Sequence, residues 1–420
     1  MTYIEIRSLG PIRYCKFPLK DFTILTGAQA AGKSTLAKVV YYFSTLGQDI
    51  FAQIISRRNV EDYHSRLEQD LQKRLRSKFL QTFGSSWSME ADMKISCAQD
   101  GHVLLEVFLQ PDPHDAYRNY VAFTLGEQIR EFVNRYEDHE YVWDVEQERA
   151  ELWQAIQAML DNPYHTVYIP AGRSTITLLT DRLGAIIDGS ERLIDYCTRK
   201  YMSLTSDLRI RFREGTRGLL DEALHTTQAK VAKKELQRLQ QLMDSVLQGK
   251  YTYRMGEERL EMPNHRYVKI NFASSGQQET VWVFNLLYYY MLSAKPTFII
   301  IEEPESHLFP DAQKMIAEAL GVFGHNKNRV LVTTHSPYIL GEFNNLLYAP
   351  QIEVSRAKVE KVIPQIEHLP VQETAAFYLA QGKLQIAMEE GLIRNELIDG
   401  ASDAINEEME RLLNLEEEAL

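Results

Sequence analysis

The sequence predicts an α/β fold whose core is divided along the chain by a mixed, largely helical insertion. An apolar run at residues 22–25 leads into a glycine-bounded loop and a helix expected over 34–43. Two more apolar runs, at 298–301 and 330–332, flank a helix expected over 311–323. Parallel strands must be joined by such crossovers, so the first and last thirds of the chain are expected to share one parallel sheet.

The first apolar run ends in a candidate phosphate-binding loop. Residues 27–34, Gly-Ala-Gln-Ala-Ala-Gly-Lys-Ser, fit the pattern G-x-x-x-x-G-K-[ST] in the strand, loop and helix context that it needs. Backbone N–H groups of such a loop and the positive end of the helix face the same anion. The alternative is a glycine turn that carries Lys-Ser by chance, and the flanking elements argue against it. The residues expected to bind ATP are Gly27, Ala28, Gln29, Ala30, Ala31, Gly32, Lys33, Ser34 and Thr35.

Composition limits the class of protein. The chain has 420 residues, 45% hydrophobic and 25% charged, which is ordinary for a folded protein of two or three units. No apolar stretch reaches the ~20 residues that span a bilayer, so we expect a cytoplasmic protein without membrane contact. Cys15, Cys97 and Cys197 are odd in number and far apart, which argues against a disulfide framework or a zinc site.

The charge of the chain bears on nucleic-acid binding. A net charge of −12 disfavours general binding to a polyanion. Basic residues nevertheless cluster at 57–58, 73–78, 209–213 and 230–238, whereas the last fifteen residues are rich in glutamate. Each basic cluster is either a solvated helix face or a DNA contact, so DNA stays an alternative partner.

The positions of the apolar runs and of the phosphate-loop motif predict a core made of residues 1–50 and 265–350. The insertion, residues 51–264, is expected to hold antiparallel strands and a helical or short coiled-coil lobe, and residues 351–420 a helical C-terminal segment. A hairpin is expected over 93–109, where two strand-like runs flank Gln-Asp-Gly. The stripe in the helical lobe is too short for an extended coiled coil, which favours an amphipathic packing helix. It consists of Leu236, Leu239, Met243 and Val246.

Residues 271–279, Asn-Phe-Ala-Ser-Ser-Gly-Gln-Gln-Glu, precede the second apolar run and resemble the LSGGQ signature of ABC-type ATPases. Ser274, Gly276 and Gln277 match this signature, and Ser275 replaces its first glycine. Alone, Ser-Ser-Gly-Gln is typical of a turn or a helix cap. Together with the phosphate loop, the paired carboxylates after the second run and a later histidine, it resembles an ABC-type P-loop core.

This resemblance implies roles for single residues. Lys33 would contact the β- and γ-phosphates, and Ser34 and Glu302 would hold Mg²⁺, although Glu replaces the more usual Asp. Glu303 would polarise the attacking water, and His335 would contact the γ-phosphate or that water. The alternatives are a solvated strand end for the two carboxylates and a capping or core role for the histidine.

The same resemblance implies that two copies of the chain share each site. Ser274, Ser275, Gly276 and Gln277 of one subunit would complete the phosphate site of another, which requires at least a dimer when ATP is bound. Arg173 follows a strand expected over 166–169, where it would either sense the γ-phosphate or form a structural ion pair. Tyr14 and Phe17 are near enough in sequence to be considered for stacking on adenine.

Within the ABC class, residues 302–310 and 334–337 resemble the RecF and OLD branch. The layout is similar to stand-alone ATPases of bacterial anti-phage defence, such as the ATPase subunit of the PARIS system. This implies a homo-oligomeric, ATP-hydrolysing switch that controls a separate effector protein such as a nuclease, because no nuclease or nucleophile motif follows His335. Two alternatives are a RecF-like DNA-repair ATPase and a nucleotide-stabilised scaffold that sequesters a toxic partner.

Overall fold

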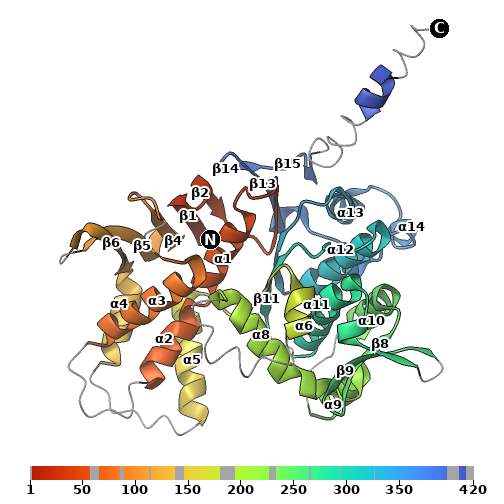
Figure 1. Cartoon of the computed structure of the whole chain (residues 1–420), viewed down its shortest axis with the longest axis horizontal. Helices are drawn as coiled ribbons and strands as arrows, with labels where there is room; N and C mark the ends of the chain where they lie inside the picture. The colour runs from red at the N-terminus through yellow and green to blue at the C-terminus, as the bar shows by residue number, and fades with distance from the viewer. Residues whose placement is uncertain are drawn as a thin grey trace.

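The computed structural model confirms the α/β fold, with one large mixed sheet and helices packed on it (Figure 1). None of the helices in the described part of the chain is long and apolar enough to cross a bilayer. The three cysteines are buried free thiols, and burial raises the pKa of Cys15 and Cys97 to about 12. The structure describes residues 2–56, 66–85, 89–112, 115–137, 146–179, 194–226, 233–263, 266–293, 295–325, 327–394 and 406–412.

The large sheet has 11 strands in the order β6-β5-β4-β1-β2-β14-β13-β3-β12-β11-β7. Its parallel part is β13-β3-β12-β11-β7, and β1, β2, β4, β5 and β6 form an antiparallel part. The strands of the sheet are β1 Thr2–Leu9, β2 Ile12–Pro18, β3 Phe22–Gly27, β4 Lys94–Gln99, β5 His102–Asp112, β6 Asp115–Leu125, β7 His165–Ile169, β11 Thr297–Glu302, β12 Arg329–Thr333, β13 Thr374–Ala380 and β14 Lys383–Ile386.

Two hydrophobic cores cover the two faces of the parallel part. Along β11, Phe298 and Ile300 point into one core, and Ile299 and Ile301 point into the other. All six residues of β11 are buried, as expected for a central parallel strand that reads as a continuous apolar run. The apolar runs therefore place the ends of β3, β11 and β12 at one edge of the sheet.

Each of the two cores is completed by a separate layer of helices, one on each face of the sheet. The core that contains Phe298 is called the first side below, and the core that contains Ile299 the second side. On the first side lie α1 Lys33–Ser44, α2 Leu46–Ser56, α3 Leu67–Phe83, α4 Glu127–Arg135 and α5 Glu146–Leu160. On the second side lie α6 Arg173–Leu179, α9 Gly215–Thr226, α10 Lys233–Leu247, α11 Ser275–Leu292, α12 Pro310–His325 and α13 Pro337–Tyr348, and α8 Tyr196–Leu208 contributes to both. Smaller elements are β8 Lys250–Arg254, β9 Glu257–Glu261, β10 Tyr267–Lys269, β15 Met388–Glu389, β16 Leu392–Ile393, α14 Arg356–Val359 and the 3₁₀ turns η4 Arg209–Phe212, η6 Ile270–Phe272, η7 Ala349–Gln351, η8 Gln365–Glu367 and η9 Val371–Glu373.

Two expectations for the insertion are confirmed by its elements. Strands β4 and β5 pair antiparallel across the expected turn. Helix α10 is amphipathic and packs on α11 and α12 through its apolar stripe, as a packing helix does. The residues of α10 that are buried in this contact are Leu236, Leu239, Leu242, Met243 and Leu247.

Two expectations about organisation differ from the structure. The sequence predicts a mainly helical segment over 351–420, with one strand after His335, yet two strands of this segment, β13 and β14, lie inside the large sheet. The sequence predicts that residues 51–264 form an insertion outside the core, yet β7, which lies in this range, is the outer parallel strand of the core sheet beside β11. Both strands pair with partners that are distant in sequence, β7 with β11 and β13 with β3, and the local pattern of a strand does not identify such a partner.

Candidate ATP-binding and catalytic site

The phosphate loop joins β3 to α1, and its two glycines adopt backbone conformations that other residues avoid. Gly27 has φ 144° and Gly32 has φ 105°. A Cβ on Gly27 would lie 2.3 Å from the carbonyl oxygen of Leu379 in β13, and one on Gly32 would lie 2.9 Å from Ile12 Cγ1. Larger residues at either position would push the loop off its neighbours, so the glycines fix its shape.

The start of α1 is open to an anion. The N-cap residue is Gly32, no side chain makes a capping hydrogen bond to this end of the helix, and no acidic residue lies in the first turn. Lys33 is folded back, and its Nζ donates to the carbonyl oxygens of Gly27 at 2.7 Å and Ala28 at 2.9 Å. Burial lowers the pKa of Lys33, and the negative charges of Glu303 and Glu305 oppose this change. The negative charge of a bound phosphate would stabilise the charged form of Lys33, which burial disfavours.

A hollow of about 600 Å³ lies over this loop. It brings together most of the predicted loop residues with the side chains that follow β11 and β12. Gly27 and Ala28 lie at the base of the loop, outside its lining. The residues that line it are Pro11, Gln29, Ala30, Ala31, Gly32, Lys33, Ser34, Thr35, Glu303 and His335.

Glu303 and His335 lie close together beside the phosphate loop because they follow β11 and β12, which are neighbouring strands of the sheet. The His335 Nδ1 atom is 3.7 Å from Glu303 Oε1, and the two side chains are 56% and 34% exposed. Glu303 has φ 42°, a strained value for a non-glycine residue, and its N–H donates to the carbonyl oxygen of Thr333 at 2.9 Å. Such strain is common where a side chain is held in a working position.

Glu302 lies at the end of β11 on the face that α1 covers, and it is 4% exposed. Its Oε2 accepts a hydrogen bond from the Ala171 N–H at 3.2 Å, whereas Oε1 is buried without a partner in the described residues. Ser34 is exposed at the start of α1. A hydroxyl and one carboxylate oxygen with a free coordination position fit Mg²⁺, which keeps its other ligands as phosphates and waters.

The signature residues begin α11 and lie outside the hollow of their own chain. Ser274 is the N-cap: its Oγ accepts from the Gln277 N–H, and the Gln277 side chain closes a capping box. Gly276 packs tightly, since a Cβ there would lie 3.0 Å from the carbonyl oxygen of His307. The segment does cap a helix, and its capping geometry leaves the exposed N-terminus of the 18-residue helix facing outward.

Comparison with known proteins adds the family. The AAA_15 family model, described as an AAA ATPase domain, matches residues 1–340. The chain belongs to this ATPase family. No curated protein matches it. Among solved structures it is similar to an Smc head domain of Pyrococcus furiosus bound to the C-terminal domain of ScpA (10% identity, 97% of this chain and 99% of that chain covered, TM-score 0.42) and to the SMC head domain of Thermotoga maritima (10% identity, 92% and 98% covered, TM-score 0.35).

In this ATPase, Arg173 is a structural residue and does not reach the phosphate loop. Its side chain is fully buried and pairs with Glu279, 3.2 Å from Nε to Oε2. The guanidinium also donates to the carbonyl oxygens of Pro170, Glu279, Glu302 and Glu303. Of the two alternatives for Arg173, the structural ion pair is correct, and contact with the γ-phosphate is not supported by this geometry.

The two aromatic residues considered for the adenine differ in position. Phe17 is wholly buried and packs edge-on against Phe377, with ring centroids 5.7 Å apart, so it is excluded from stacking on a base. Tyr14 is 44% exposed on β2. It remains a candidate at the sheet edge that leads to Pro11 and the hollow.

Sequence reasoning missed three contributors to the site of the ATPase. Strand β13 supports the phosphate loop through Leu379, and Glu279 and Glu305 form buried contacts near the catalytic strands. For β13 a signal was present, because Thr374–Ala380 is mostly apolar and is followed by Gln381-Gly382, a turn pair. For the two glutamates only three-dimensional packing reveals the partners.

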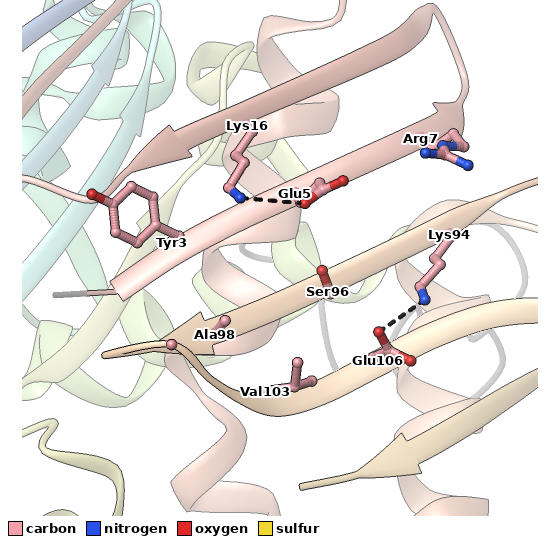
Figure 2. Close-up of a pocket in the computed structure, with 10 residues that line it drawn as sticks. Tyr3, Glu5, Arg7, Lys16, Lys94, Ser96, Ala98, Val103 and Glu106 are labelled. Carbon is pink, nitrogen blue, oxygen red and sulfur yellow. Dashed lines mark ion pairs between the residues drawn. The ribbon is translucent and has the colours of Figure 1, made fainter.

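A second hollow, of about 690 Å³, lies on the outer face of the antiparallel part and shares no residue with the first (Figure 2). Its charged side chains are of both signs, with three basic and two acidic residues. Lys16 pairs with Glu5 at 3.8 Å, and Lys94 pairs with Glu106 at 2.9 Å, as drawn in Figure 2. Two of the three basic side chains are therefore paired with a carboxylate of the same hollow.

Several residues of the basic clusters of the insertion are paired with carboxylates within the chain. Lys78 is buried against Asp49, and Arg74 pairs with the same carboxylate at 3.3 Å. Arg211 pairs with Glu222, and Arg238 pairs with Glu318 and Glu367. Arg57, Arg58 and Lys230 of these clusters, and Glu416 to Glu418 of the acidic end, lie outside the described residues.

Proposed function

We propose that this ATPase is a nucleotide-operated switch that closes as a dimer around ATP and Mg²⁺, hydrolyses the ATP, and so controls a separate effector protein. The observation that carries the proposal is the single hollow lined by the phosphate loop, Glu303 and His335. Backbone N–H groups, an ammonium, a carboxylate and an imidazole around one space fit a triphosphate and an attacking water.

Each side chain then has a defined task. Lys33 leaves the loop carbonyls and binds the β- and γ-phosphates. Glu303 orients the water and accepts its proton, and His335 contacts the γ-phosphate. Mg²⁺ held by Ser34 and Glu302 would neutralise charge on the phosphate oxygens. Loss of the γ-phosphate removes the contacts that favour the closed state, so hydrolysis shifts the dimer toward opening.

Dimerisation is supported by two features that are exposed in the single chain, a helix N-terminus and two large apolar side chains. The N-terminus of α11 is exposed and uncovered by its own phosphate loop, and a helix N-terminus attracts phosphate. Phe272, just before the signature, is 81% exposed, and Phe309, after the catalytic strand, is 76% exposed. Large apolar side chains at these places favour burial against a second copy.

A mixing experiment tests whether the signature acts in the partner's site. Ser274→Asp keeps an N-cap residue but places a negative charge where a phosphate should lie, so turnover should fall at least about tenfold. Lys33→Ala removes the phosphate contact in the same chain. Equimolar mixing should restore roughly a quarter of wild-type turnover, because half of random dimers are mixed and each keeps one intact site of two.

Ser274→Asn is the matched control, since it keeps the cap without the charge, and it should lose less activity than Ser274→Asp. Sedimentation must show that the mixed dimers form with ATP. Mixed dimers without recovered turnover would exclude action of the signature in trans.

The effector is proposed to be a separate protein, and bacterial anti-phage defence is the setting that the RecF and OLD resemblance favours. No group of three or more His, Cys, Asp or Glu side chains in the described ranges could hold a metal ion. The many internal ion pairs of the basic clusters make DNA binding the weaker alternative. A scaffold that sequesters a toxic partner is compatible with the switch.

A trapped complex from the native host tests the partner. Glu303→Gln protein, tagged and isolated with ATP present, should retain a stoichiometric protein partner, because slow hydrolysis holds the closed state. Wild-type protein isolated with ADP is the control and should retain less. Recovery of DNA without a protein partner would replace the switch by the DNA-repair alternative.

A further inference from the structure

Glu305 is a buried carboxylate beside His335 that no step of the proposed reaction uses. It is 4% exposed, two residues beyond Glu303. Its Oε1 accepts the Thr334 hydroxyl at 2.6 Å and the His335 N–H at 2.9 Å. One carboxylate oxygen therefore holds the backbone and the preceding side chain of the loop that carries the imidazole.

The imidazole itself lies beside two carboxylate oxygens. Its Nδ1 lies 3.5 Å from Glu305 Oε1 and 3.7 Å from Glu303 Oε1, and the side chain is 56% exposed. His335 lines the ATP hollow and also a third hollow, of about 420 Å³, which Gln313 and Tyr338 line as well. Both carboxylates thus lie near Nδ1, and Glu305 also holds the backbone N–H of the same residue.

Stability alone does not account for Glu305. Its second oxygen, Oε2, is buried without a hydrogen-bond partner in the described residues. A buried unpaired carboxylate oxygen costs free energy, so an apolar or amide side chain would suit the fold as well or better. What a glutamate at this position does provide is the pair of hydrogen bonds that Oε1 accepts from the loop that carries His335.

We propose that Glu305 is a positioning residue for ATP hydrolysis, holding the Nδ1 side of His335 toward the carboxylates so that Nε2 faces the nucleotide. The acceptor beside one ring nitrogen decides which nitrogen carries the proton, so Glu305 keeps the proton on Nδ1 in the neutral ring. This inference rests on the proposed function, because it assigns His335 to the hydrolysed phosphate.

Glu305→Gln in the full chain tests the proposal. We expect kcat to fall about 10- to 100-fold, as for loss of a group that orients a working histidine, with KM and ATP affinity unchanged. Glu305→Asp, which retains the charge, should recover part of the rate. In nucleotide-free protein with ¹⁵N-labelled histidine rings, the His335 signals, assigned by their loss in His335→Gln, should move away from the Nδ1–H form in Glu305→Gln.

Glu367→Gln is the matched control, since Glu367 is 1% exposed and pairs with Arg238 away from the nucleotide. It should leave kcat and the His335 signals unchanged. Wild-type kcat or unchanged His335 signals in Glu305→Gln would overturn the positioning role. The ring signals are read without ATP, so they test Glu305 separately, whereas wild-type protein that binds but never hydrolyses ATP would instead contradict the proposed function.

Discussion

Replacing Glu303 by Gln should lower ATP turnover by about 10²- to 10⁴-fold, the range for loss of a general base, while ATP binding is retained. Gln has the same length, and the strained φ of 42° and the N–H bond to Thr333 belong to the backbone. The variant loses only the charge that would polarise the attacking water. Phosphate release, calorimetric ATP binding and sedimentation with ATP measure the three expected effects, including accumulation of the closed dimer.

Glu5→Gln is a suitable control because Glu5 pairs with Lys16 in the other hollow, outside the ATP site. It should change neither turnover nor association. Unchanged turnover in Glu303→Gln would remove Glu303 from catalysis. Loss of ATP binding together with turnover would instead indicate that the carboxylate supports the loop.

The nucleotide site was largely predictable from sequence because its parts are local. The loop pattern carries its own geometry at Gly27 and Gly32, and the buried run of β11 ends at Glu302 and Glu303 in the chain itself. His335 follows β12 in the same way. In each case a strand direction known from the sequence delivers the residue to the same edge of the sheet.

The features that could not be predicted from the sequence depend on contacts between distant segments of the chain. Strand β13 supports Gly27 from more than three hundred residues away, and nothing in its composition names that partner. Arg173 had two equally good interpretations because a guanidinium suits both phosphate and carboxylate. Only the depth of the residue and the position of Glu279 decide between them.

Arg173→Met should destabilise the fold by about 3–5 kcal/mol, the usual cost of breaking a buried ion pair. Both side chains of the pair are 0% exposed, so the variant leaves the Glu279 carboxylate buried without its arginine. The N–H groups of residues 173 and 174 still donate to it, and His307 Nδ1 lies 3.8 Å from its Oε1. It also removes the donor from the carbonyl oxygens of Glu302 and Glu303. Chemical denaturation of wild type and variant measures the change.

Arg211→Met is the matched control, because Arg211 pairs with Glu222 where the side chains are 45% and 50% exposed, and an exposed pair contributes only about 0–1 kcal/mol. The double variant Arg173→Met, Glu279→Gln should be more stable than Arg173→Met alone, since the stranded charge is gone. Equal losses in Arg173→Met and Arg211→Met would contradict a structural role for the buried pair.

The same variant separates the two interpretations of Arg173 by nucleotide binding. A residue that senses the γ-phosphate would, when removed, weaken binding of ATP more than that of ADP. The observed contacts predict equal weakening, because Arg173 touches the nucleotide site only through the backbone behind Glu302 and Glu303. They also predict lower turnover, since Arg173 joins α11 to that backbone through Glu279, and a shift of the signature helix would reach Glu303 by this route.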